Sequence, residues 1–92
     1  MTITDLDIER CVLELLSSRA PTSSICPSDV ARTLLCNEDE WRASMPRVRQ
    51  VAARMAREER VVITQGGSTL DADPTIHGPI RLRRGAKFSA SK

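Results

Sequence analysis

The sequence predicts a small α+β domain in which three helices precede a β-hairpin. Apolar residues recur at helical spacing in three separate segments of the first 57 residues. The pattern then changes at Val61-Val62-Ile63-Thr64, a β-branched run that is typical of a strand. The Gly66-Gly67 pair that follows is a hairpin signal, so we expect the chain to turn back on itself there.

The composition limits the class of protein. Ninety-two residues, 40% of them hydrophobic, suffice for one domain with a modest core, which must be aliphatic because Trp41 and Phe88 are the only aromatic residues. No apolar stretch approaches the roughly 18 residues of a membrane span, and the acidic start MTITDLDIER is unlike a signal peptide. The three cysteines are an odd number and lack the spacing of a disulfide-rich domain, which favours reduced thiols. We therefore expect a cytoplasmic protein with no membrane partner.

The first helix is predicted at about residues 4–18. Thr4 and Asp7 have the spacing of a capping box, in which the two side chains satisfy backbone N–H groups at the start of a helix. An apolar stripe at helical spacing follows, made of Ile8, Cys11, Val12, Leu15 and Leu16. Proline and clustered hydroxyl residues at 20–24 then predict a loop.

A short second helix is predicted at about 27–36. Pro27 suits the first helical position, and Asp29 places a negative charge in the first turn, where it favours the helix dipole. The buried stripe consists of Val30, Ala31, Leu34 and Leu35. We interpret Asn37-Glu38-Asp39-Glu40 as a polar break.

The third helix is expected to start at Pro46. Its buried stripe consists of Val48, Val51, Ala52 and Met55. Because successive residues are rotated by about 100° around the helix axis, four polar residues lie on the side away from that stripe, namely Arg47, Gln50, Arg54 and Arg57. This helix therefore has one apolar side and one arginine-rich side.

Short strands are expected at 61–64, 68–70 and 80–83, and residues 22–26 are a candidate for a further strand beside them. Three helices followed by a hairpin, in this order and size, predict a winged helix over residues 4–84, with 85–92 as a flexible C-terminal tail. Helices two and three would form the helix-turn-helix, and 61–83 the wing. A three-helix bundle with a loose tail is the weaker alternative, because it leaves the β-branched run and the two glycines unexplained.

Several short motifs resemble a small bacterial family of domains of unknown function. They are CPSDVAR at 26–32, WR at 41–42, MPRVR at 45–49, QGG at 65–67 and GPIRLR at 78–83. The resemblance covers about residues 8–84 and implies a winged-helix-like fold in a bacterial cytosol. It implies no particular activity.

The charge is distributed unevenly along the chain. Residues 1–45 contain eight acids and four arginines, whereas residues 46–92 contain ten basic residues and four acids. Such asymmetry is typical of a surface for nucleic acid or another anionic partner. Because the second helix of a helix-turn-helix lies in the major groove, we expect DNA binding by helix three and the wing. The expected contacts are Arg47, Gln50, Arg54, Arg57, Arg81 and Arg83.

Duplex DNA is the expected nucleic acid, since readers of single strands stack bases on aromatic side chains. Two other roles for the arginines stay open. Arg42, Arg47 or Arg49 could hold Asp29 as a structural lock between helices two and three. The arginines could also be a solvated face paired with Glu58, Glu59 and the acidic N-terminal half.

A second function class is a protein-interaction module on the same scaffold, including a homo-oligomer in which acidic and basic halves meet head to tail. The arginines discriminate between the two classes. An open stripe of Arg47, Arg54 and Arg57 continuous with the wing favours DNA. Bridges from these arginines to Asp29 or to Glu38-Asp39-Glu40 favour the interaction module.

The sequence gives little reason to expect an enzyme, a metal or a cofactor. His77, the only histidine, lies near Asp71 and Asp73, but the spacing fits no metal-ligand motif, so a solvated loop is the better interpretation. Cys11 and Cys36 are expected to be buried thiols on apolar helix faces. Cys26 precedes a helix, but no histidine base is placed near it. The two glycines lack the Lys-Ser/Thr of a phosphate loop.

Overall fold

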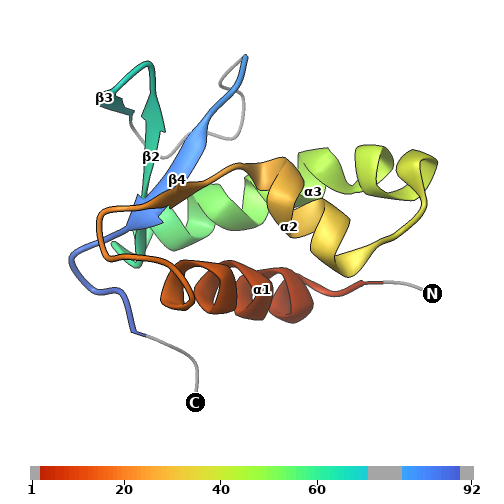
Figure 1. Cartoon of the computed structure of the whole chain (residues 1–92), viewed down its shortest axis with the longest axis horizontal. Coiled ribbons are helices and arrows are strands. Elements are labelled where there is room, and N and C mark those ends of the chain that lie inside the picture. Colours follow the sequence, from red (N-terminus) through yellow and green to blue (C-terminus); the bar gives the residue numbers. More distant parts are fainter. Residues whose placement is uncertain (1–2, 71–77, 90–92) are drawn as a thin grey trace.

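The computed structural model describes residues 3–70 and 78–89, and these residues form three helices and a four-stranded antiparallel sheet (Figure 1). The helices are α1 (Asp5–Ser17), α2 (Pro27–Leu34) and α3 (Glu38–Arg57). The strands are β1 (Ser24–Ile25), β2 (Val61–Gln65), β3 (Ser68–Leu70) and β4 (Arg81–Arg84). This arrangement is winged-helix-like and confirms the predicted α+β class.

The predicted starts of the first two helices are confirmed. The Asp7 N–H donates to Thr4 Oγ1 at 3.1 Å, and the Thr4 N–H donates to Asp7 Oδ2 at 2.9 Å, which completes the capping box. These bonds hold the pKa of Asp7 below its ordinary value, because they favour the ionised carboxylate. At α2 the Cys26 N–H donates to Asp29 Oδ2 at 2.9 Å. The helix ends at Leu34, two residues before the predicted end.

The predicted start of the third helix is wrong. The helix begins at Glu38, and Pro46 lies inside it. Asn37 is the N-cap, since its side chain accepts a hydrogen bond of 3.1 Å from the Glu40 N–H. The residues interpreted as a polar break are therefore a helix start, where an amide cap and negative charge satisfy free N–H groups and the dipole.

The strand order in the sheet is β1-β4-β2-β3. Ile25 on β1 pairs with Leu82 on β4, which in turn pairs with Ile63 on β2, so three apolar side chains form one inward-facing row. The predicted short strand near residue 24 and the return at 68–70 are both confirmed. Gly66 and Gly67, at φ 58° and 85°, make the tight turn between β2 and β3.

The core lies between the inner face of the sheet and the three helices. It is aliphatic, as the composition predicted, and its largest fully buried residues include Ile8, Leu16, Ile25, Met55, Ile63 and Leu82. Among the described residues, no helix is both long and apolar enough to cross a membrane.

The chain beyond β4 also contacts the domain. The Lys87 N–H donates to the Glu59 carbonyl at 2.8 Å, and Phe88 packs against the core. Arg84 lies over the Phe88 ring, 4.7 Å from its centroid, and donates to the carbonyls of Leu16 and Arg19 at the end of α1. The domain boundary at residue 84 stays a prediction, and the last three residues of the predicted tail lie outside the described chain.

Candidate nucleic-acid interface

The outward flank of α3 carries the four residues predicted from helical spacing. Gln50 and Arg57 are exposed, as is Arg47, whereas Arg54 is half-buried. The buried side of the helix faces the core through Val48, Val51, Ala52 and Met55. The four long polar side chains are therefore directed away from the core.

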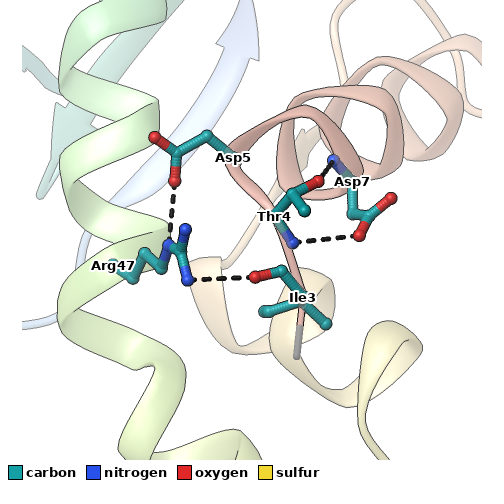
Figure 2. Close-up of polar contacts among 5 residues, drawn as sticks. All are labelled: Ile3, Thr4, Asp5, Asp7 and Arg47. Atoms are coloured by element: carbon teal, nitrogen blue, oxygen red, sulfur yellow. Dashed lines mark hydrogen bonds and ion pairs between the residues drawn. The ribbon is translucent and has the colours of Figure 1, made fainter. Parts of the chain in front are cut away.

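Arg47 connects α3 to the start of α1, as Figure 2 shows. Its Nε–H donates to Asp5 Oδ1 at 2.8 Å, and its Nη1 donates to the Ile3 carbonyl at 2.9 Å. The pair is open to solvent, because 45% of the Arg47 side chain and 60% of the Asp5 side chain are exposed. Arg47 is thus accessible, although a carboxylate already occupies part of its guanidinium.

Arg54 has a second acidic neighbour on α1. Its Nη2 lies 3.5 Å from Glu9 Oε1, and its side chain is 43% exposed. Glu9 itself is only 15% exposed, and it also forms a direct ion pair with Arg60. A carboxylate this deeply placed requires such partners, so the Glu9–Arg60 pair is part of the packing between α1 and the end of α3.

Asp5 and Glu9 belong to the acidic N-terminal half that one alternative paired with the arginines, but the sequence analysis did not single them out. They lie four residues apart on α1, beside the buried stripe that contains Ile8 and Val12. Their position next to this stripe places them at the edge of the helix–helix contact. That signal is present in the sequence, but it does not say which helix lies opposite.

The predicted lock between Asp29 and an arginine is not formed. Asp29 caps the backbone of its own helix, while Arg42 pairs with Glu38 at 2.9 Å within α3. Arg49 donates to the Gly78 carbonyl at 2.8 Å, which links α3 to the chain entering β4. The physical reason is local competition, since a carboxylate at the third helical position reaches its own cap without any tertiary rearrangement.

The other two predicted contacts, Arg81 and Arg83, lie together on the outer face of the sheet. Both are exposed, whereas Leu82 between them is buried. Arg81 is fixed on β1, where it donates to Ser24 Oγ at 2.8 Å and to the Ser24 carbonyl at 3.0 Å. Within the described chain, neither arginine has a carboxylate within ion-pair distance, so this face is positively charged.

Trp41 lies in the first turns of α3 rather than before the helix, which corrects its predicted position. It is partly buried and packs against the core, as expected of a large apolar residue. The guanidinium groups of Arg32 and Arg42 lie 4.7 Å and 5.0 Å from its ring centroid. The contact from Arg32 connects α2 to α3, whereas Arg42 belongs to α3 itself.

The first turn of α3 is acidic, with Glu38, Asp39 and Glu40 all exposed. Of the three, Glu38 has an arginine partner within the described residues. This turn lies at the end of the molecule away from the sheet (Figure 1). The arrangement separates an acidic end from a basic sheet face.

The described residues contain no group of His, Cys, Asp and Glu side chains suited to a metal ion. The predicted loop around His77, Asp71 and Asp73 lies outside them. Cys11 is a buried thiol, as predicted, whereas Cys36 is exposed because α2 ends before it. Cys26 is half-buried, and Arg81 Nη1 lies 3.0 Å from its sulfur.

The fold and the charged surface define a small winged-helix-like α+β protein with arginines on two outward faces. A family model matches residues 5–85, and the chain belongs to this family, which is described as a protein of unknown function, DUF3253. The predicted resemblance to a domain of unknown function is thereby confirmed. No match was found among curated proteins.

Proposed function

We propose that this protein binds duplex DNA through the outward flank of α3 and the outer face of β4. The observation that carries the proposal is the exposed Gln50 on the second helix of the helix-turn-helix, flanked by Arg47, Arg54 and Arg57. A helix in this position lies in the major groove, where arginine binds phosphate or guanine and glutamine binds adenine. Arg47 and Arg54 are bridged to Asp5 and Glu9 of α1, so the stripe is not fully open. Neither arginine is bridged to Asp29 or to the acidic turn, which was the pattern expected of an interaction module.

The positive sheet face supplies the second part of the proposed contact. Arg81 and Arg83 lack carboxylate partners within the described chain, so they keep their full charge for phosphate oxygens. Such contacts fix the orientation of a protein on the duplex without selecting a sequence. We propose a binding protein rather than an enzyme, acting in a bacterial cytoplasm.

The test is fluorescence anisotropy of a labelled mixed-sequence duplex, titrated at several salt concentrations. The variant Arg57→Gln/Arg83→Gln removes one charge from each proposed face. The matched control Arg10→Gln/Arg19→Gln removes two exposed arginines from α1 and the loop after it. We expect the first variant to weaken binding and to reduce the slope of log affinity against log salt by about 0.9 for each lost phosphate contact. Equal behaviour of the two variants would refute the proposed interface.

The acidic first turn of α3 favours a second candidate function, a protein-interaction module. The N-terminal residues of a recognition helix contact base edges, and there Asp39 and Glu40 would repel the nearby phosphates. A basic protein partner, including the sheet face of a second copy, would instead be attracted. This candidate predicts no DNA binding at low salt by folded protein, together with a partner that is lost in Asp39→Asn/Glu40→Gln.

A further inference from the structure

The contact between Arg47 and the start of α1 bears directly on the proposed DNA site. Arg47 uses Nε and Nη1 for Asp5 and the Ile3 carbonyl (Figure 2), and nearly half of its side chain is exposed. A carboxylate oxygen and a phosphate oxygen are interchangeable acceptors for a guanidinium, with similar hydrogen-bond geometry. An internal anion thus already occupies part of the guanidinium to which a phosphate would bind.

We propose that Asp5 competes with DNA phosphate for Arg47 and thereby limits the affinity of the chain for DNA. The inference rests on the proposed function and adds a residue that controls it. Exposed ion pairs such as this one are weak, so a phosphate can displace Asp5 without disrupting the fold. The Asp5 carboxylate then remains beside the bound phosphate and repels it.

Glu9 has a different role, although it also pairs with an arginine of the same flank. Glu9 is 15% exposed and is held by Arg60 as well as Arg54, so it cannot leave without exposing a charge to a poorly solvated site. Asp5 is 60% exposed, and within the described residues its ion-pair partner is Arg47. Competition with phosphate is therefore assigned to Asp5, and Glu9 to the packing of α1 on α3.

The competition has a distinct effect on salt dependence. A free arginine that binds phosphate causes release of a cation from the DNA, which makes affinity fall as salt rises. When Arg47 exchanges Asp5 for a phosphate, the freed carboxylate attracts a cation again, so the net release is smaller. Removal of the Asp5 charge should therefore steepen the salt dependence as well as raise the affinity.

The experiment compares Asp5→Asn with Glu14→Gln, which removes the same charge from an exposed position of α1 that has no arginine partner in the described chain. Both are titrated with the labelled duplex at several salt concentrations, after circular dichroism has shown that they are folded. We expect Asp5→Asn to bind about 1.5- to 5-fold more tightly at low salt. Its slope of log affinity against log salt should be steeper by about 0.9.

A double-mutant cycle separates the pair from a general effect of net charge. In an Arg47→Gln background, Asp5→Asn should have no more effect than Glu14→Gln, because the contested guanidinium is gone. Equal shifts for Asp5→Asn and Glu14→Gln in the native background would overturn the competition while leaving DNA binding intact. Absence of binding in every folded protein would overturn the proposed function and the competition together.

Discussion

At the residue scale, the arginines of this chain have different roles although they are the same residue type. Arg84 caps the end of α1 and lies on Phe88, so it is part of the structure. Arg60 holds the half-buried Glu9. Arg83 is exposed on the outer face of the sheet, and the described part of the chain places no carboxylate within ion-pair distance of it. Burial and partner, rather than residue type, therefore decide which arginine is available for a ligand.

The Cys11 thiol gives a prediction about pH. Burial raises the pKa of Cys11 from 9.0 to about 11, with a smaller contribution from the negative charge of Glu14 and an opposing hydrogen bond from Thr33. The folded state therefore keeps this proton where the unfolded state loses it. The stabilisation is complete below pH 9 and is lost as pH rises from about 9 to 11, by up to roughly 2 kcal/mol.

Urea unfolding of the native protein and of Cys11→Ala, measured at intervals from pH 8 to pH 11, checks this expectation. Other groups that titrate in this range are common to both proteins, so the difference between the two curves isolates Cys11. The native protein should lose more free energy of unfolding across the interval than the variant. Parallel curves would mean that the thiol ionises equally in the folded and unfolded states.

At the element scale, α3 has a well-stabilised first turn and a destabilising proline near its middle. Asn37 and three acids stabilise its first turn, whereas Pro46 lies in the ninth position of the helix. A proline there lacks the N–H that would donate to the Arg42 carbonyl, and its ring crowds that carbonyl. The helix nevertheless continues, because its buried stripe packs against α1, α2 and β2.

Replacement of Pro46 by alanine should stabilise the protein. The side chain is exposed, so no core contact is lost, and alanine restores one hydrogen bond within the helix. The greater freedom of the unfolded chain offsets part of the gain, which leaves about 1 to 2 kcal/mol.

Urea unfolding of Pro46→Ala measures this gain, with Gln50→Ala as the control at another exposed position of the same helix. The control should change the free energy of unfolding by less than about 0.5 kcal/mol. A loss of stability in Pro46→Ala would show that the proline has a favourable role in α3.

At the scale of the whole molecule, charge is separated in space as well as along the sequence. The acidic first turn of α3 is at the end of the molecule away from the sheet, on which Arg81 and Arg83 lie exposed (Figure 1). Between these ends, Asp5 and Glu9 offset two arginines of α3. An anionic ligand is thus attracted at the sheet and repelled at the acidic turn.

This polarity predicts the effect of Asp39→Asn/Glu40→Gln on DNA binding. If α3 enters the groove, loss of two negative charges near the phosphates should raise affinity roughly two- to fourfold at low salt, with the gain fading as the ionic strength rises. Anisotropy titrations at two salt concentrations check this, with Glu14→Gln as the reference for the loss of one distant charge. Unchanged or weaker binding would place the acidic turn outside the DNA interface.

The sequence alone was sufficient for the class of fold and for most of its elements. Periods of apolar residues identify α1 and α2, the β-branched run identifies β2, and Gly66-Gly67 identifies the turn. These signals are local, since each depends on spacing or on the conformational preference of a few neighbouring residues. The start of α3 was mispredicted for two reasons. Asn37 and the three acids after it are equally compatible with a loop and with a helix cap, and Pro46 is a residue type that is common at the first position of a helix.

The sequence also identified which side chains of α3 point away from the core, because helical spacing alone determines that. Only the tertiary structure decided what those side chains meet. Arg47 pairs with Asp5, which is 42 residues away in the sequence, and Arg54 pairs with Glu9, because α1 packs along the same flank of α3. Arg81 and Arg83 have no such partner among residues 3–70 and 78–89, because β4 lies inside the sheet with its polar face outward. Ion pairs depend on distances of a few ångströms between distant segments, and those distances exist only once the core has packed.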